Sequence, residues 1–291
     1  MKQIQFLMPA CIMAWAFAAC ENRLSSEAET INERYGNLTL SVMQLEQTPF
    51  STITRSDPTD VCTRLNFAVY DMSGERQKQV NQEIDDSDFG TATFQLNEGQ
   101  YELVVVAHSS GGNPTMTDPA KIQFTNSQGY TDTFLYDDVV NITEEPRTIN
   151  LTLHRIVSLC RFIINDAIPE GVAKLQFQYT GGSGHFNART GLGVTKSIQK
   201  VAYSVQAGKK HTQYDLYTFL HGAEGELKIT VTAYDSSGNT LYERLFEGVP
   251  MQRQKITYMS GDFFTGQGAA TMQTFTITID DNWQGEIEVT Y

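Results

Sequence analysis

The segment FQLNEGQYELVVVA, residues 94–107, decides the fold of this chain. Its second part, YELVVVA (101–107), is almost continuously apolar, which predicts a central strand that is buried on both faces. The turn residues NEGQ (97–100) separate this run from Phe94 and Leu96, whose alternation with polar residues predicts a neighbouring strand. The segment therefore predicts a sheet whose middle strand is covered on both sides.

The same period of two continues on either side of this segment. Apolar residues alternate with polar or small ones in residues 38–42, 65–69, 149–153, 175–179, 227–233 and 274–279. Turn sequences close several of these runs, namely DMSG (71–74), GGSG (181–184) and DSSGN (235–239). We find no stretch with the pattern of an amphipathic helix. The sequence therefore predicts an all-β fold made of antiparallel β-sandwiches.

The chain divides naturally near His154 and Arg155, between a strand that closes one half and a strand that opens the next. We therefore expect an N-terminal β-sandwich domain over residues 36–154 and a C-terminal one over residues 155–291. Residues 20–35 are polar and acidic after Cys20 and contain little to bury, which favours a tether ahead of the first domain.

Residues 1–19 have the layout of a secretory signal peptide, with Lys2 at the start and an apolar run that ends in small residues. The run is shorter than the roughly 20 apolar residues of a membrane-spanning helix. Its last residues and the next one, Phe17-Ala18-Ala19-Cys20, fit the lipobox of bacterial lipoproteins, in which the cysteine is acylated and the preceding peptide is removed.

We therefore predict that Cys20 is lipidated. Several acyl chains, at about 0.8 kcal/mol for each buried methylene, would hold the protein on a membrane. The alternative is an ordinary signal peptide that happens to contain a cysteine. Cys11 is a poorer candidate, because it follows Pro9 and leaves too short an apolar region.

The charge of the chain argues against a nucleic-acid partner. Residues 1–19 contain one of the 21 basic residues and none of the 34 acidic ones, so the mature chain has a net charge of −14. Such a surface repels phosphate backbones.

The sequence offers no set of residues typical of an enzyme, a cofactor site or a metal site. The five histidines are scattered, at positions His108, His154, His185, His211 and His221. GGSG lacks the strand-turn-helix context of a nucleophile elbow, and TGGSGHFNARTGLG (180–193) lacks the lysine and helix of a phosphate loop. We expect no catalytic residue, cofactor or metal, although a carboxylate pair brought together by folding stays open.

Two cysteines follow the predicted anchor, Cys62 and Cys160, in apolar runs that we assign to different domains. Export permits a disulfide, but its Cα atoms must lie within about 7 Å, so we favour two buried thiols. A surface glycan-binding protein is the rival function. Trp283 is the only tryptophan beyond the signal peptide, which weakens that alternative, although tyrosines could replace tryptophan.

Five stretches, taken in order, are similar to those of a known family. They are RLNFAVYDMSG (64–74), DFGTATFQLNEGQYELVVVAHSSGGNPTMTDPAKIQF (88–124), TDTFLY (131–136), LHRIVSLCRFIINDAIPEGVAKLQFQYTGGSG (153–184) and MQRQKITYMSGDFF (251–264). The chain resembles, from about residue 36 to its C-terminus, the fimbrillin-like anchor and accessory subunits of Bacteroidetes fimbriae.

The resemblance implies two tandem transthyretin-like β-sandwich domains, a lipidated N-terminus on the outer membrane, and strand addition with fimbrial stalk subunits. Stalk subunits of this family lose an N-terminal strand to an arginine-specific protease, and a neighbour's C-terminal strand fills the groove. Anchor subunits keep their N-terminus and end the fibre at the cell. We therefore expect a lipid-anchored, surface-exposed subunit that attaches a fimbrium to the outer membrane and supports adhesion.

Arg55, in TITRSDP (52–58), keeps one alternative open. If the chain is processed there, it is a stalk or tip subunit rather than an anchor. A ligand on a host or bacterial surface is compatible with either role.

The C-terminal residues predict the contact for polymerisation. Apolar residues recur at every second position in 274–279 and again in 285–291, so each segment could lay one face into a partner's groove. The alternative is that both segments are ordinary strands of the second domain, which is nearly equal for residues 274–279 and less favoured for residues 285–291.

Overall fold

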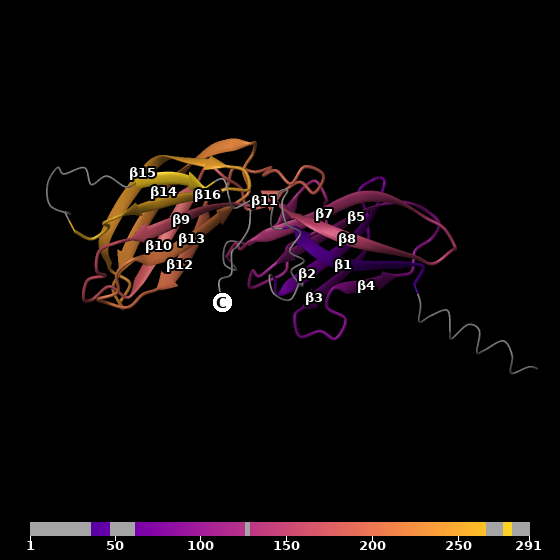
Figure 1. The fold of residues 1–291 in the computed structure, drawn as a ribbon, viewed down its shortest axis with the longest axis horizontal. Helices are drawn as coiled ribbons and strands as arrows, with labels where there is room; N and C mark the ends of the chain where they lie inside the picture. Colours follow the sequence, from indigo (N-terminus) through magenta and orange to yellow (C-terminus); the bar gives the residue numbers. More distant parts are fainter. Residues whose placement is uncertain (1–35, 47–61, 126–128, 266–275, 281–291) are drawn as a thin grey trace, which may run out of the picture. The chain divides into compact units, whose positions relative to one another are not determined.

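The computed structural model describes residues 36–46, 62–125, 129–265 and 276–280, and every regular element in these ranges is a β-strand (Figure 1). This confirms the predicted all-β class. Within the described ranges, the chain has no helix of the length and apolar character needed to cross a membrane.

The first eight strands run to Arg155. They are β1 (Leu38–Glu46), β2 (Arg64–Asp71), β3 (Arg76–Glu83), β4 (Thr91–Phe94), β5 (Gly99–His108), β6 (Ile122–Gln123), β7 (Thr133–Ile142) and β8 (Arg147–Arg155). Seven of them form one sheet in the order β3-β2-β5-β7-β8-β1-β4. β7 and β8 pair only at Phe134–Arg155 and Leu135–His154.

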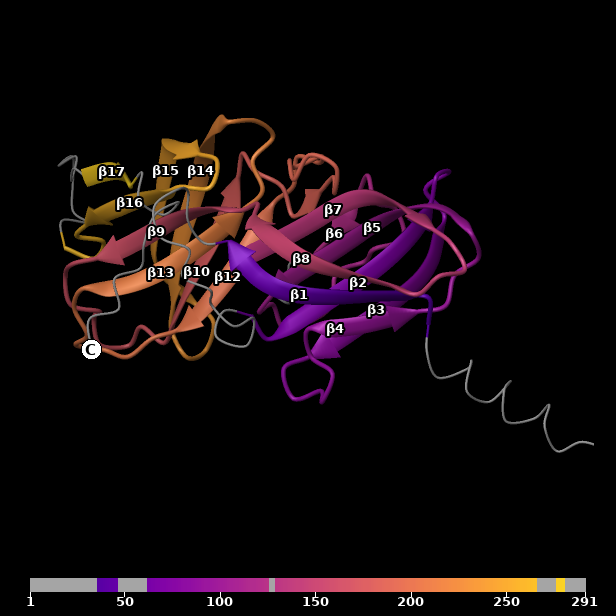
Figure 2. The same cartoon turned by 45° about the vertical axis from the view of Figure 1, so that its right-hand side comes forward.

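Side chains of β8, β1 and β4 share one apolar cluster with those of β2, β5 and β7, so the sheet closes on itself around a core. We call this unit the first sandwich. Figure 2 shows β1 and β8 running beside each other along it. The predicted middle strand is β5, in which residues 103–107 are fully buried as predicted. Leu103 and Val105 face the first core, whereas Val104 and Val106 join a second cluster on the opposite face.

The remaining strands form a second unit. They are β9 (Ser158–Ile164), β10 (Lys174–Thr180), β11 (His185–Phe186), β12 (Gln199–Ser204), β13 (Thr212–Thr218), β14 (Glu224–Tyr234), β15 (Thr240–Gln252), β16 (Ile256–Gly261) and β17 (Thr276–Asp280). Two sheets, β12-β10-β14-β15 and β13-β9-β16-β17, contribute side chains to one apolar cluster. We call this unit the second sandwich. The predicted turn 235–239 joins β14 to β15.

The two sandwiches have the same strand order. The run β3-β2-β5-β7 corresponds to β12-β10-β14-β15, and β4-β1-β8 corresponds to β13-β9-β16, with β17 added beside β16. In each unit, the first strand pairs in parallel with the strand at the end of the repeat, β1 with β8 and β9 with β16. Every other pair among the described strands is antiparallel. These parallel pairs could not be predicted, because alternation in a strand does not report the direction of its neighbour.

The link between the sandwiches is short, since β8 ends at Arg155 and β9 begins at Ser158. The cluster on the outer face of β5 takes side chains from both sides of this link, and β6 pairs with β11 across it. The described part of Gly36–Tyr291 accordingly belongs to one compact unit. The division into domains 36–154 and 155–291 stays a prediction.

Candidate functional site

Several predicted functional residues lie outside the described ranges. These are the lipidation residue Cys20, the candidate processing residue Arg55, Trp283 and the segment 285–291. The structure bears on assembly through two other elements, the first strand β1 and the C-terminal strand β17.

β1 lies in the middle of its half-sheet, between β4, with which it is antiparallel, and β8, with which it is parallel. Its apolar residues enter the first core, since Leu38, Leu40 and Leu45 are fully buried and Val42 is nearly so. Full burial of such a side chain stabilises a protein by about 1.5–3 kcal/mol. β1 is therefore an integral part of the first sandwich.

The residue before β1 fixes where the strand begins. The Asn37 Nδ2 group donates hydrogen bonds to the carbonyl oxygens of Leu96 (2.8 Å) and Thr143 (3.2 Å). The Leu96 N–H donates in return to Asn37 Oδ1 (2.9 Å). Asn37 thus joins the chain before β1 to the loop before β5 and to the turn between β7 and β8.

Because Arg55 follows β1 in the sequence, a cut at Arg55 would separate β1 from the rest of the chain. The remaining chain would keep β4 and β8 but lose the strand that pairs with both. Processing at Arg55, the alternative given above, would therefore leave an open strand site between β4 and β8.

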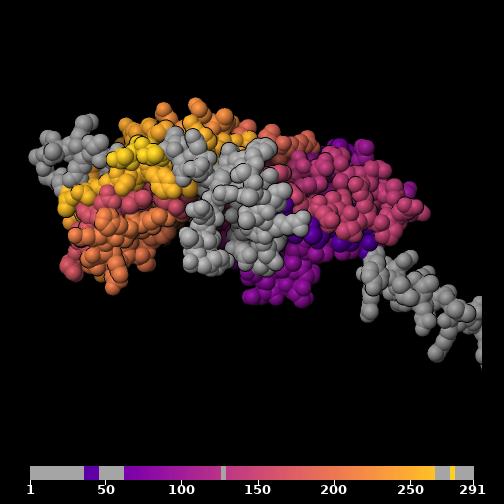
Figure 3. Space-filling model, in the orientation of Figure 1, coloured from indigo at the N-terminus to yellow at the C-terminus, as the bar shows by residue number. Residues whose placement is uncertain are grey.

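β17 is an edge strand of the second sandwich. It pairs with β16 in antiparallel register from Ile256–Asp280 to Ser260–Thr276, and no other described strand pairs with it. Residues 276–278 are exposed, with Ile277 at 41%, and Figure 3 shows this part of the chain in yellow at the surface. Residues 276–280 thus adopt the alternative given above, a strand of their own sheet, with one hydrogen-bonding edge unpaired by described strands.

The two described cysteines, Cys62 and Cys160, are separate buried thiols rather than a disulfide, as predicted. Cys62 belongs to the first core and Cys160 to the second. Burial raises the pKa of each thiol to about 12, so neither supplies a reactive thiolate.

The histidines form no metal site, because the described residues contain no group of three or more potential metal ligands. His108 is fully buried, with Nε2 2.8 Å from Asn66 Oδ1 and Nδ1 accepting from the Ser110 N–H at 3.0 Å. Burial, with the nearby Arg64 charge, lowers the pKa of His108 to about 3. A neutral imidazole with both nitrogens engaged is a structural element.

The GGSG sequence is a packed turn. The Ser183 hydroxyl is buried, donates to the His185 carbonyl (2.7 Å) and accepts from the His185 N–H (3.0 Å). A Cβ atom on Gly182 would lie 1.9 Å from Thr218 Oγ1, so glycine is required there by close packing. Ser183 therefore has neither the exposure nor the partner of a nucleophile.

Folding does bring one carboxylate pair together, on neighbouring strands of the first sandwich. Glu102 of β5 has a side chain that is 1% exposed, and it accepts two hydrogen bonds from the Arg189 guanidinium, at 2.6 and 3.0 Å. Asp137 of β7 hydrogen-bonds to Glu102, and its Oδ1 atom is buried with no hydrogen-bond partner. Burial first, and then the charge and hydrogen bond of Glu102, raise the pKa of Asp137 to about 7.

The Glu102–Asp137 pair is part of an ionic bridge. Arg189, which comes from the second sandwich, forms an ion pair with Glu102. The sequence carried a signal of it, since Glu102 interrupts the apolar run 101–107. An isolated acidic residue in a buried strand requires a partner, but the sequence could not show that the partner is Arg189.

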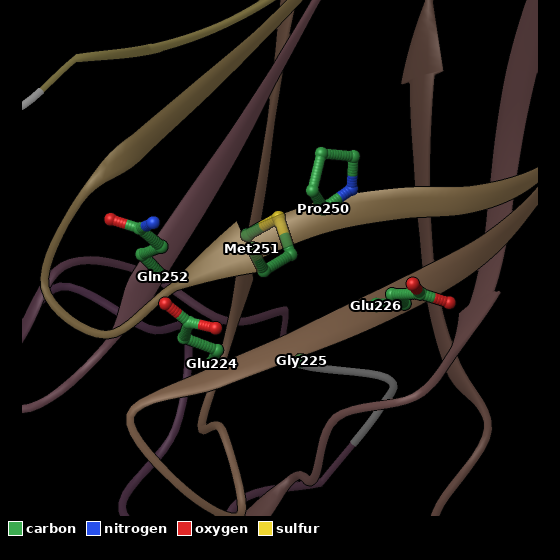
Figure 4. A pocket seen from close by; sticks show the side chains of 6 residues that line it. All are labelled: Glu224, Gly225, Glu226, Pro250, Met251 and Gln252. Carbon is green, nitrogen blue, oxygen red and sulfur yellow. The ribbon is translucent and has the colours of Figure 1, made fainter.

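A surface hollow of about 340 Å³ lies where β14 begins and β15 ends. It is lined by Glu224, Gly225, Glu226, Pro250, Met251 and Gln252. In Figure 4, Glu224 and Gln252 lie beside each other, whereas Glu226 lies further along β14. The hollow contains neither an aromatic platform for a sugar nor a nucleophile with a base.

Comparison with known proteins places this chain in a family. A family of unknown function (DUF6562) matches residues 30–291. The chain belongs to the DUF6562 family. No curated protein matches this DUF6562 chain.

Several solved structures are similar to the DUF6562 chain. A candidate adhesin from Bacteroides ovatus ATCC 8483 has 14% identity, with 80% of this chain and 88% of that one covered, at a TM-score of 0.47. The fimbrial anchor protein Mfa2 from Porphyromonas gingivalis has 11% identity, 84% and 96% coverage, and a TM-score of 0.44. A fimbrial assembly protein from Parabacteroides distasonis ATCC 8503 has 13% identity, 84% and 97% coverage, and a TM-score of 0.39. Similarities at this level assign no role to the DUF6562 chain.

Proposed function

We propose that this protein is a lipid-anchored, surface-exposed fimbrial subunit, which attaches a fimbrium to the outer membrane through β-strand exchange and supports adhesion. Three features of the sequence support the proposal: the lipobox that ends at Cys20, the polar tether over residues 20–35, and the ordered resemblance to fimbrial anchor and accessory subunits.

The observation that carries the anchor role is the place of β1. This N-terminal strand fills the position between β4 and β8 and closes the first core with its own apolar side chains. A subunit that keeps β1 needs no strand from a neighbour to complete its first sandwich. It therefore suits the end of a fibre, with its C-terminal residues left to contact the next subunit.

The first test concerns the lipid. Wild-type protein and the Cys20→Ala variant are compared in outer-membrane fractions, and the N-terminal peptide is examined by mass spectrometry. We expect wild-type protein in the membrane, with acyl mass on Cys20, and the variant in the soluble fraction. Unchanged membrane retention of the variant, or a wild-type peptide without acyl mass, rules the anchor out.

The second test concerns the fibre. Intact surface fimbriae are extracted from outer membranes with detergent and purified through an internal tag placed on the exposed turn 236–238. Co-purification of fimbrial stalk subunits supports the proposal, whereas recovery of this chain alone contradicts it.

The alternative of a stalk or tip subunit has a distinct outcome. A mature protein that begins at Ser56 has lost β1 and requires a donor strand, whereas one that begins at Cys20 keeps it. The N-terminal sequence of protein taken from intact fimbriae decides between them.

We also propose that the protein is not an enzyme. Among the residues that the structure describes, the groups nearest to a catalytic set are Ser183, which is buried in a turn, and Glu102, which is bound by Arg189. Turnover of any substrate by the purified protein would overturn this proposal. Binding to a glycan array that depends on Trp283 or on exposed tyrosines would favour the glycan-binding alternative.

A further inference from the structure

The parallel pairing of β1 with β8 determines how the first sandwich responds to tension. Leu38 at the start of β1 lies beside Arg147 at the start of β8, and the parallel pairing continues to Glu46 beside His154, with one register shift between Val42 and Gln44. The chain therefore enters β1 at one end of the pair and leaves β8 at the other end.

A pull between the chain ends acts on these two strands in opposite directions. Tension before Leu38 draws β1 toward the end of the pair where Arg147 lies, whereas tension beyond Arg155 draws β8 toward the other end. The strands are thus pushed to slide past each other along their axes. In this geometry the inter-strand hydrogen bonds bear the load together, whereas in peeling they bear it one after another.

The second sandwich repeats this arrangement. Leu159 at the start of β9 lies beside Ile256 at the start of β16, and Ile164 lies beside Gly261. Tension that arrives through Ser158 and leaves after Gly261 therefore also slides the two strands past each other.

We infer that the two parallel pairs are shear clamps in series, which resist tension between the N-terminal and C-terminal ends of the subunit. The clamp property follows from the strand register. It rests on the proposed function only for the source of the tension, a membrane anchor at one end and a fibre at the other.

The strands are fastened at the points where the load leaves them. At the end of β8, the Arg155 guanidinium donates two hydrogen bonds to the Asp132 carboxylate, at 2.7 and 2.6 Å. After β16, the Asp166 carboxylate accepts three backbone N–H groups from residues 263–265, at 2.9, 2.7 and 2.7 Å. Charge-assisted hydrogen bonds of this kind are about twice as strong as neutral ones.

β17 lies outside the clamp and is loaded differently. It runs antiparallel to β16, with Asp280 beside Ile256, so the chain leaves β17 at the end of the sheet where β9 begins. Tension on the C-terminus therefore peels β17 from β16 one residue pair after another. β17 separates at low force and leaves the β9–β16 clamp intact.

The test is single-molecule force spectroscopy of the full-length chain in two pulling geometries. Both proteins carry a fused handle at the N-terminus, and both have Cys11 and Cys20 replaced by serine. In the first protein the other handle is fused to the C-terminus, so that β1 and β8 are sheared. In the second protein a maleimide handle is attached to Glu145→Cys, in the exposed turn before β8. Cys62 and Cys160 are buried and stay unlabelled.

A pull at residue 145 draws β8 from its Arg147 end, which is also the Leu38 end of β1, and so peels the pair apart. We expect the first sandwich to rupture at a severalfold higher force in the end-to-end geometry than in the Glu145→Cys geometry. A low-force release of the C-terminal strand precedes that rupture in the end-to-end pull.

Equal rupture forces in the two geometries, or a lower force in the end-to-end pull, overturn the inference. An equal free energy of unfolding for the two proteins in urea confirms that Glu145→Cys is silent. Since neither protein has a lipid, these outcomes are independent of the Cys20→Ala fractionation, which tests the proposed function.

Discussion

Buried polar side chains position the loops of this protein at the scale of single residues. Asp166, in the loop after β9, is 9% exposed. Its carboxylate accepts hydrogen bonds from the three backbone N–H groups of residues 263–265, in the loop after β16. Asn37 has a comparable role before β1. In both cases one side chain replaces the strand pairing that a loop lacks, since buried backbone groups must find a hydrogen-bond partner.

We predict that Asp166→Ala lowers the free energy of unfolding by about 3 kcal/mol, because it leaves the buried N–H groups of Phe263 and Phe264 and the part-buried one of Thr265 without an acceptor. Urea denaturation at neutral pH measures the change. Glu170→Ala, at an exposed site in the same loop, is the control and should change stability by less than about 0.5 kcal/mol. Equal effects of the two substitutions would show that the Asp166 contacts are weak.

His108 gives the fold a dependence on acid pH. Its pKa is about 3 in the folded protein, against 6.5 for an ordinary histidine, because burial and the Arg64 charge disfavour the imidazolium. As pH falls from 6.5 toward 3, the unfolded chain binds a proton that the folded chain does not. Stability attributable to His108 is therefore lost over this window, by up to about 1.4 kcal/mol per pH unit.

We predict that His108→Gln reduces the loss of stability between pH 6.5 and pH 5 relative to wild type. Urea denaturation at several pH values measures this difference. His154→Gln, at an exposed position, is the matched control. A His108→Gln slope equal to that of wild type would contradict the buried neutral histidine.

β1 is the decisive part of the molecule at the scale of elements. Its four buried apolar side chains contribute roughly 6–12 kcal/mol by area, which is comparable with the entire stability of a typical domain, about 5–15 kcal/mol. A chain without β1 would therefore not keep a closed first sandwich.

We predict that a chain beginning at Ser56 shows a molten first sandwich and that a synthetic peptide of residues 36–46 restores it. Near-ultraviolet circular dichroism and binding of a hydrophobic dye report the change. A peptide with Leu40→Asp is the control and should fail, because it brings a charge to a fully buried position. A stable Ser56 chain without peptide would show that β1 is dispensable.

The elements differ in how well the sequence predicted them. Alternation identified β10 and β14, because Leu175, Phe177 and Ile229 bury one face of each strand while the other face is solvated. β3 was missed, since its sequence RQKQVNQE is polar on both faces, as suits a sheet edge. The parallel neighbours of β1 and β9 could not be predicted, because they depend on residues distant in the sequence.

The Glu102–Asp137–Arg189 cluster connects the two sandwiches at the scale of the whole molecule. Glu102 and Asp137 come from β5 and β7, and Arg189 from the loop after β11. Asp138 beside Asp137 adds a further negative charge, and Tyr70 of β2 lies near Glu102. Two buried carboxyl groups in contact favour sharing a proton, so the state of this junction depends on pH.

The effect of Asp137 on the pH dependence of stability is opposite to that of His108. Its pKa is raised from 3.8 to about 7 in the folded protein, so the folded chain holds a proton that the unfolded chain releases. This stability is fully present below pH 3.8 and is lost as pH rises toward 7. We predict that Asp137→Asn removes this loss, so that stability rises more steeply with pH than in wild type.

Urea denaturation between pH 5 and pH 7 measures the effect, with Asp85→Asn, at an exposed site away from the cluster, as the control. Hydrogen exchange of the loop around Arg189 provides a local readout, because ionised Asp137 repels Glu102 and loosens the bridge. Identical pH profiles for Asp137→Asn and wild type would show that the pair shares no proton.

The pairing of β1 with β8 also determines when the first sandwich can form during synthesis. β1 emerges early, but β8 is made only after every other strand of that sandwich. Contacts between such distant segments form slowly, because a long loop must close before they are made. Until β8 arrives, β1 has only part of its hydrogen-bonding partners, and its apolar side is incompletely covered. β1 is therefore among the last strands to acquire all of its pairing partners. During this interval, a strand from another chain could occupy its position.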